Sequence, residues 1–491
     1  HSLLALGLLE RVRALGLGVQ VRTLFQHPRL ADFAQALGRE QGQLQGQVQI
    51  EVPANLIPED CTAITPQMLT LVDIDAAQIA GIEAAVPGGA ANIQDIYPLA
   101  PLQEGILFHH MLHADSDAYV TSHVLAFDSR QRLERFVASF NEVIARHDIL
   151  RTAVLWEGLG EPVQVVYRHA QLQPEWSAAD AQQPHPRIDV RQAPMARALA
   201  GSRAQDGRWL LRLLCHHLVI DHQTLELLVH EIALIQQGRR ELLSAPLPFR
   251  RFVAHACRGV GEAEHRAFFT ALLGDVTEPT APYGLLDVQG DGGAVQEARL
   301  RLDDGLAGRI RQQARRSGVS SAALFHLAWA LVLGRATGRD DVVFGTVLFG
   351  RMQGGRGAER AVGLFINTLP VRLQLGARSV RQCLDDTHAL LAQLLHHEHA
   401  SLSLIQRCSG LAGGLPLFSA LFNYRYGAQG SQDTAPAWEG MDMLESRERS
   451  NYPFGMSVDE QGSAFTLAAQ VAQPADCLLY TSDAADDMQC V

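Results

Sequence analysis

Cysteine and long apolar runs are both scarce in this chain, and their scarcity excludes several classes of protein. The 491 residues include seven cysteines, an odd number scattered along the sequence with no CxxC pair. This pattern implies neither a disulfide framework nor a cysteine metal site, and it suits a reducing cytoplasm. No apolar run reaches the length of a membrane span, and the first residues are not typical of a signal peptide.

Positive charge is scarce as well. Lys and Arg total 41 against 53 Asp and Glu, which gives a formal net charge of -12. Because no basic stripe is present, we do not expect a nucleic acid partner. The hydrophobic share of 47% and the charged share of 19% are typical of a globular protein, and the length allows two or three domains. The chain begins at His1 rather than at Met, so we expect a piece of a longer protein.

Reactive side chains are concentrated in the stretch Cys-His-His-Leu-Val-Ile-Asp-His, residues 215–222. An apolar run at 209–217 is typical of a strand, and residues 223–237 have apolar side chains at helical spacing. Two histidines therefore end a strand, and an aspartate enters a helix. Since side chains alternate across a strand, His216 and His217 are expected to point to opposite faces. We predict that His217 is the active histidine and that His216 is its structural neighbour.

Asp221 is expected to orient this turn, because a carboxylate held by an internal arginine would fix the backbone around it. The positive end of the helix dipole favours a neutral imidazole, the form that accepts a proton. Two other interpretations stay open. In a chain with twenty histidines the pair can arise by chance. A zinc site from His216, His217, Asp221 and His222 is disfavoured, because opposed strand faces spoil tetrahedral convergence and no HExxH supports it, so no metal is expected.

The octapeptide 215–222 resembles the His-His-x-x-x-Asp motif of the chloramphenicol-acetyltransferase-like superfamily, in particular the condensation domains of non-ribosomal peptide synthetases. The common form of that motif ends in Asp-Gly, whereas this chain has Asp221-His222. That departure is similar to the subgroup with dual epimerisation and condensation activity. The resemblance implies an α/β fold in which two acetyltransferase-like lobes form a V-shaped pseudo-dimer with a central channel.

A second block strengthens the resemblance to dual domains. Residues 95–110 are similar to the opening motif of condensation domains. Dual domains continue with His-His-Ile/Leu, four residues and Gly-Asp. Here His109, His110 and Asp117 match, while Met111 replaces Ile/Leu and Ser116 replaces Gly. The alternative is a helix whose histidines cover a solvent-facing surface.

Further stretches resemble the remaining motifs of the family, at residues 146–152, 248–255, 362–372 and 423–424. By this resemblance, structural or channel-lining roles are implied for Asp117, Arg146, Arg151, Arg351, Asn367, Arg372 and Asn423. The sequence does not choose between Arg351 and Arg372 as the partner of Asp221. The hairpin of residues 153–156 and 162–167 is expected in the same sheet as strand 209–217.

The two ends of the chain differ from this pattern. Residues 1–38 resemble the C-terminal part of a helical peptidyl carrier domain, in which Ser2 would bear 4'-phosphopantetheine; otherwise Ser2 is simply a helix cap. We expect a linker at 39–62, a first lobe at 63–270 and a second lobe at 271–476. Residues 477–491 do not continue the family pattern and are interpreted as a non-native tail.

The implied activity is amide formation between two thioesters held on carrier domains. An upstream peptidyl thioester is the donor and a downstream aminoacyl thioester is the acceptor, with prior L-to-D epimerisation of the donor residue. His217 would serve as base or orient the amine, and His110 would tune or complete the proton exchange. The implied partners are phosphopantetheine-bearing carrier domains and adenylation domains of one assembly line, acting in antibiotic or other secondary metabolite biosynthesis. The alternatives are condensation without epimerisation, epimerisation alone, a coenzyme A-dependent acyltransferase, and an inactive docking scaffold.

Overall fold

The computed structural model describes most of the chain from residue 52 onward. The described ranges are 30–40, 52–113, 117–176, 187–203, 206–288, 295–351, 357–412, 414–427, 438–447 and 450–472, with residues 8, 11, 12, 23 and 24. Ser2, most of the predicted carrier segment and the tail after 472 lie outside the described residues. Within residues 1–51 the structure gives one helix with bounds, α3 (Leu30–Glu40).

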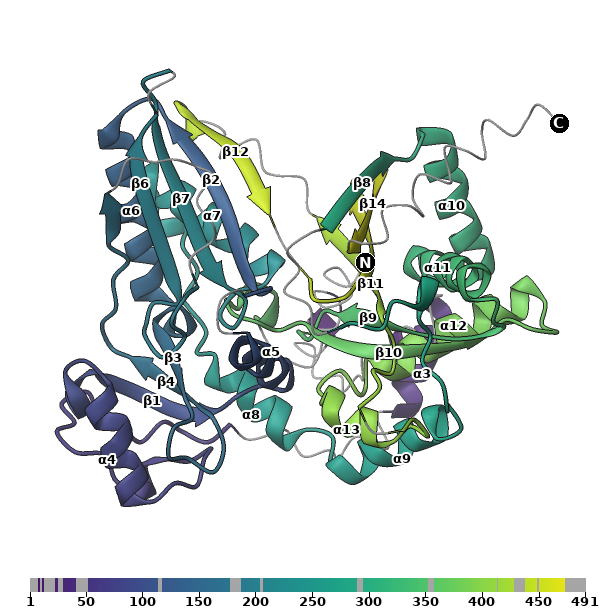
Figure 1. The fold of residues 1–491 in the computed structure, drawn as a ribbon, viewed down its shortest axis with the longest axis horizontal. Coiled ribbons are helices and arrows are strands. Elements are labelled where there is room, and N and C mark those ends of the chain that lie inside the picture. Colours follow the sequence, from purple (N-terminus) through teal and green to yellow (C-terminus); the bar gives the residue numbers. More distant parts are fainter. Residues whose placement is uncertain are drawn as a thin grey trace.

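Two lobes, each built on a twisted sheet with helices packed on it, spread apart like the arms of a V (Figure 1). The sheet of the first lobe has the order β12-β2-β7-β6-β5. Its strands are β2 (Val120–Phe127), β5 (Pro174–Trp176), β6 (Ala196–Ser202), β7 (Trp209–His216) and β12 (Met441–Arg447). Helices α6 (Arg130–Arg146) and α7 (His222–Gln236) pack on each other and cover this sheet.

A smaller sheet of order β1-β4-β3 lies beside the first lobe, next to α4 (Ala76–Ala85). Its strands are β1 (Ile93–Pro98), β3 (Thr152–Leu155) and β4 (Val163–Tyr167). The expectation that the β3–β4 hairpin joins the sheet of β7 is therefore wrong. Ile93, Val163 and Tyr167 bury their side chains in a separate cluster with Ile79 and Ile82 of α4, and this apolar contact draws the hairpin away.

The second lobe contains a six-stranded sheet of order β10-β9-β11-β13-β14-β8. Its strands are β8 (Val295–Arg301), β9 (Asp341–Leu348), β10 (Asn367–Gln374), β11 (Ala420–Gly427), β13 (Phe454–Gln461) and β14 (Ala464–Ala472). Its helices are α9 (Glu262–Leu273), α10 (Asp304–Ser317), α11 (Ser321–Thr337), α12 (Val380–Leu394) and α13 (Leu402–Arg407). The two lobes have separate apolar cores, one around Phe127 and Leu211 and the other around Phe344 and Phe422.

One strand crosses between the lobes. β12 follows β11 in the chain, inside the range expected for the second lobe, yet it pairs antiparallel with β2, from Met441 opposite Phe127 to Arg447 opposite Ser122. The chain then returns to the second sheet at β13 (Figure 1). The segment around β12 therefore ties the lobes together.

Two more helices complete the architecture, α5 (Pro101–Leu112) between the lobes and α8 (Arg250–Arg258) below it (Figure 1). Among the described residues, no single helix has both the length and the apolar character needed to cross a membrane. Helices α10 and α11 reach that threshold only as a pair, and a bend of 106° separates them.

Candidate active site

The predicted reactive turn lies where β7 gives way to α7. β7 ends at His216, one residue earlier than the sequence suggested, and Asp221 is the N-cap of α7. The backbone N–H of His217 donates to the carbonyl of Tyr119 over 2.8 Å, so this turn is tied to the chain that enters β2. His217 therefore lies in the short connection between the end of β7 and the first turn of α7.

The hydrogen bond of the His217 ring decides which nitrogen is available. Nδ1 lies 3.1 Å from the carbonyl oxygen of Ile220, and a carbonyl oxygen can only accept. The ring therefore carries its proton on Nδ1 and presents the lone pair of Nε2. The side chain of His217 is half-buried, so the imidazole is partly accessible to solvent and is not enclosed in the apolar core.

Asp221 is held from both lobes. Its Oδ1 accepts from the backbone of Thr224 over 2.7 Å and caps α7. Its Oδ2 accepts from the backbone of Phe365 over 3.1 Å. Arg351, just after β9, binds both oxygens, at 3.1 Å from Nη1 to Oδ2 and 3.3 Å from Nη2 to Oδ1. Both side chains are almost completely buried, so this two-pronged pair fixes the turn that carries His217.

Of the two arginines left open by the sequence, Arg372 is the wrong one. Its guanidinium binds Asp341, 2.6 Å away, and Asp275. The physical reason is the register of the sheet: β10 runs antiparallel to β9, which brings Arg372 beside the start of β9 at Asp341, whereas Arg351 follows the far end of β9. The pKa of Arg372 is raised by its hydrogen bonds to Asp341 and Asp275.

His216 is fully buried and has a defined tautomer. Its Nδ1 accepts from the backbone N–H of Leu218 over 3.1 Å, so the proton resides on Nε2. Nε2 donates to Oδ2 of Asp117 over 3.0 Å. Burial lowers the pKa of His216, and its hydrogen bond to Asp117 opposes that shift.

Asp117 joins the two histidine motifs. The same Oδ2 lies 2.6 Å from Nδ1 of His110, and Oδ1 accepts from the backbone of Tyr119 over 2.9 Å. Burial would raise the pKa of the Asp117 carboxyl, but the hydrogen bonds to His110 and His216 outweigh it and hold that pKa well below its usual range. One carboxylate therefore connects the second histidine of residues 109–110 to the first histidine of residues 216–217.

The same three side chains can be tested as a metal site, because the ligand atoms of His110, Asp117 and His216 lie within 4.8 Å of one another. A metal on Nε2 of His216 would move its proton to Nδ1, which must accept from the N–H of Leu218. The donor set therefore fits a hydrogen-bonded unit better than a metal centre.

His109 is half-buried and lies on a different branch of the network. Its Nε2 is 3.4 Å from Nδ2 of Asn451, whose Oδ1 accepts from the hydroxyl of Tyr119 over 2.8 Å. Burial is the main cause that lowers the pKa of His109. Sequence reasoning missed Tyr119 and Asn451, and no local pattern marks either of them.

The other predicted structural or channel residues have partners elsewhere in the fold. Arg146 binds Glu231 and the carbonyl of Ser244, and Arg151 binds the carbonyls of Tyr167 and Arg168. The side-chain amide of Asn367 donates to the carbonyls of Glu398 and Ala400. Asn423 lies in β11 opposite Ser457 of β13. These contacts hold loops and strands, and a channel-lining role for them stays a prediction.

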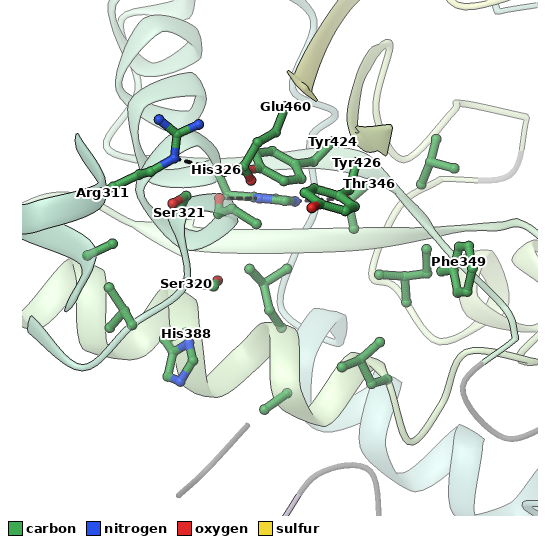
Figure 2. A pocket seen from close by; sticks show the side chains of 18 of the residues that line it. Arg311, Ser320, Ser321, His326, Thr346, Phe349, His388, Tyr424, Tyr426 and Glu460 are labelled. Atoms are coloured by element: carbon green, nitrogen blue, oxygen red, sulfur yellow. Dashed lines mark hydrogen bonds and ion pairs between the residues drawn. The ribbon is translucent and has the colours of Figure 1, made fainter. Parts of the chain in front are cut away.

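Described residues line at least two cavities. One of about 460 Å³ is lined by His110, Trp156, Arg187 and Asp189 among others. The second, of about 350 Å³, lies in the second lobe against α11 and α12, and its lining contains none of the predicted site residues. Figure 2 shows Arg311, Glu460, Tyr424 and His326 gathered at one side of this pocket and Phe349 at the other.

This arrangement of side chains can be compared with known proteins. The family model of the condensation domain matches residues 93–474. The chain belongs to the condensation domain family. The match covers both lobes, the His217 turn and its Arg351 anchor. It begins after residues 1–92, so it leaves the predicted carrier segment untested.

This condensation domain is similar to segments of much longer synthetases. It is 47% identical over 487 residues to the malpinin synthetase of Mortierella alpina, covering 96% of this chain and 6% of that protein. It is 43% identical over 501 residues to the malpibaldin synthetase of the same organism, covering 97% of this chain and 9% of that protein. A bacterial relative is a linear gramicidin synthase of Brevibacillus parabrevis, 30% identical over 429 residues (81% of this chain, 8% of that protein). The chain thus spans less than a tenth of each of these relatives.

Solved structures confirm the fold. The first condensation domain of the CDA synthetase superposes with a TM-score of 0.60 at 18% identity, covering 79% of this chain and 94% of that one. The X-domain from teicoplanin biosynthesis gives a TM-score of 0.60 at 18% identity, covering 76% and 89%. The predicted α/β fold with two acetyltransferase-like lobes is therefore confirmed.

Proposed function

We propose that this condensation domain forms amide bonds in non-ribosomal peptide synthesis, joining a peptidyl thioester on an upstream carrier to the amine of an aminoacyl thioester on a downstream carrier. The observation that carries the proposal is the tautomer of His217. With Nδ1 tied to the Ile220 carbonyl, Nε2 is free to accept a proton from an attacking amine. The malpinin, malpibaldin and gramicidin relatives support a place in a synthetase.

The reaction needs one bond made and one broken. The amine nitrogen attacks the donor carbonyl carbon, the C–N bond forms, and the C–S bond breaks. Nε2 of His217 orients the amine or takes its proton, and that proton ends on the released thiol. Holding both thioesters in one place contributes much of the acceleration, up to about 7–11 kcal/mol for ideal alignment. Asp221 and Arg351 keep the turn rigid while this occurs.

The second half of the proposal is epimerisation of the donor residue before condensation. A thioester acidifies the adjacent Cα–H, so a base can remove the proton from one face and a proton can return on the other. His217 is the proposed base. His110 acts through Asp117, whose carboxylate binds both His110 and His216. In this way His110 influences the proton exchange at the pair His216–His217 without contacting the donor. The match of His109, His110 and Asp117 to the dual motif supports this assignment.

Condensation without epimerisation is the second candidate. It is favoured by two departures from the dual motif, Met111 and Ser116. In both cases the proposed partners are carrier and adenylation domains of one assembly line in the cytoplasm. The proposed cofactor is 4'-phosphopantetheine, covalently bound to partner carriers and to Ser2. A coenzyme A-dependent acyltransferase or an inactive docking scaffold is less well supported, because the relatives are synthetases and the His217 turn is intact.

The test uses the chain between two carriers. The donor carrier is loaded with an L-peptidyl thioester and the acceptor carrier with an aminoacyl thioester. Mass spectrometry measures the product on the acceptor, and chiral analysis determines the configuration of the donor residue. We expect an elongated peptide with a D residue at that position. An L residue at that position would support condensation without epimerisation. The absence of any product, with both carriers shown to be loaded, would reject the proposal.

A further inference from the structure

We propose that Tyr119 is a positioning residue for His217, and that Asn451 holds the Tyr119 hydroxyl so that the two lobes together set the active imidazole. This inference rests on the proposed function and adds two residues to the reaction. Neither contacts the reacting atoms in the proposal. Both residues act by fixing the position and orientation of the His217 side chain.

Tyr119 contacts three members of the histidine network, which are Asp117, His217 and His109. Its backbone N–H donates to Asp117, and its carbonyl accepts from the N–H of His217 over 2.8 Å. Its ring lies edge-on to the His217 ring, with centroids 6.4 Å apart and an interplanar angle of 86°. The centroid of the same ring lies 5.8 Å from that of His109. A displacement of Tyr119 therefore displaces the backbone and the ring environment of His217 together.

The Tyr119 hydroxyl is the part of this residue that reaches the second lobe. It donates to Oδ1 of Asn451 over 2.8 Å. Asn451 is 6% exposed and lies in the segment by which the chain returns from β12 to β13. Burial raises the pKa of Tyr119 strongly, so the phenol stays neutral and keeps the proton it donates. The bond therefore links the residue just before β2 of the first lobe to the crossing segment.

The orientation of the Asn451 amide is fixed by its partners. Nδ2 donates over 2.6 Å to the carbonyl of Val288, which precedes β8 of the second lobe. Since a carbonyl can only accept, the amide nitrogen must face Val288 and the amide oxygen must face Tyr119. The second N–H of the amide is directed at Nε2 of His109. Asn451 thus joins Val288, Tyr119 and His109, and any change in the spacing of the lobes reaches Tyr119 through it.

A purely structural bond would give a different outcome from a positioning bond. A lost structural bond lowers the melting temperature and leaves the folded enzyme with normal kinetics. A lost positioning bond leaves carrier binding intact and slows the bond-forming step, because His217 spends less time in its reactive place. Separate measurement of kcat and KM, together with a double-mutant cycle, distinguishes a structural bond from a positioning bond.

The experiment compares Tyr119→Phe, Asn451→Ala and the double variant in the two-carrier assay under single-turnover conditions. We expect each single variant to lower the rate of peptide formation about 5- to 20-fold with an unchanged KM for the donor carrier. The double variant should fall no further than the slower single variant, since both single variants remove the same bond between Tyr119 and Asn451. Asn451→Asp, which keeps the accepting oxygen, should recover part of the loss.

Tyr424→Phe is the matched control. Tyr424 is also a mostly buried tyrosine whose hydroxyl is hydrogen-bonded, to Oε2 of Glu460 at 2.5 Å, but it lies in β11 beside the second-lobe pocket (Figure 2). This variant should melt at a lower temperature with an unchanged rate. A Tyr119→Phe enzyme as fast as wild type, or a double variant whose loss is the product of the single losses, overturns the inference. An inactive wild type instead overturns the proposed function on which it rests.

Discussion

Arg351 and Asp221 form a two-pronged ion pair across the two lobes, with side chains that are 0% and 1% exposed. Removing the arginine leaves a carboxylate buried without its counter-charge. We therefore expect Arg351→Leu to lower the free energy of unfolding by about 3–5 kcal/mol, measured by urea denaturation. Arg351→Leu should also lose activity in whatever fraction stays folded, because the His217 turn loses its anchor.

Arg372→Leu is the matched control for this prediction. Arg372 binds Asp341 and Asp275, whose side chains are 40% and 73% exposed, so water can solvate the carboxylates once the arginine is gone. The expected loss is about 1 kcal/mol. Equal losses in the two variants would contradict the distinction between an ion pair with a buried carboxylate and one with exposed carboxylates.

His217 and His216 should respond to substitution in opposite ways. His217→Ala removes a half-buried ring with one hydrogen bond, so the protein should fold and lose about 10²- to 10⁴-fold in peptide formation. His216→Ala removes a fully buried ring that bonds Asp117 and Leu218, so its main effect should be a lower melting temperature. Paired melting curves and carrier assays measure both. If His217→Ala keeps the wild-type rate, the proposed role of its Nε2 is wrong.

His110→Asn tests the epimerase half of the proposal. The variant loses the imidazole that shares Asp117 with His216, so peptide formation should continue while the donor residue stays in the L form. Chiral analysis of the product reads this directly. His230→Asn, on the exposed side of α7, is the control and should give the wild-type ratio. An unchanged D product from His110→Asn rejects the assignment of this histidine.

Sequence patterns are sufficient to place the His217 turn, because every residue of that motif lies within one strand end and one helix start. They also narrow the partner of Asp221 to two arginines. The choice between Arg351 and Arg372 depends on how β9 and β10 are aligned, and that register is a property of the folded sheet. The strand that ends at His216, the helix that follows it and the β3–β4 hairpin are likewise predicted to within a few residues, since their apolar spacing is local.

Long-range contacts are the part that the sequence does not reveal. Tyr119 and Asn451 are 332 residues apart, and neither belongs to a recognisable local pattern. The same holds for β12, since no local feature of its residues indicates that it joins the sheet of the first lobe. The bond from Asp117 to His216 needs the pairing of β2 with β7, which brings Val120 opposite His216.

Histidine burial in the second lobe predicts a loss of stability in mild acid. Burial lowers the pKa of His326 to about 4, while its Nδ1 donates to the carbonyl of Ala322 and its Nε2 accepts from Thr346. Since the ordinary value is near 6.5, the unfolded chain binds this proton first as the pH falls. The contribution is therefore complete above pH 6.5 and decreases until about pH 4, by roughly 3 kcal/mol in all.

The measurement is the free energy of unfolding of wild type and His326→Leu between pH 7 and pH 4. The variant has a lower free energy of unfolding at pH 7, because Ala322 and Thr346 lose their hydrogen-bond partner. As the pH falls, its free energy of unfolding should decrease less steeply than that of wild type, by the slope that corresponds to one bound proton. Other buried histidines titrate in both proteins and cancel in the comparison. Parallel curves would show that His326 is not a source of the acid sensitivity.

Gly350 and Gly338 provide a last comparison, at the backbone that leads into Arg351. Both have a left-handed conformation, with φ of 66° and 67°. A Cβ on Gly338, which caps α11, meets open space, so Gly338→Ala should cost only the conformational strain of about 1–2 kcal/mol. A Cβ on Gly350 would collide with the backbone carbonyl of Phe365, the residue whose N–H binds Asp221. Relief of that collision must move the backbone at Gly350 or at Phe365, and either movement displaces the Arg351–Asp221 pair. We therefore expect Gly350→Ala to lose at least twice the unfolding free energy of Gly338→Ala and to slow peptide formation in the folded fraction, whereas equal losses would mean that the backbone at Phe365 yields without disturbing the pair.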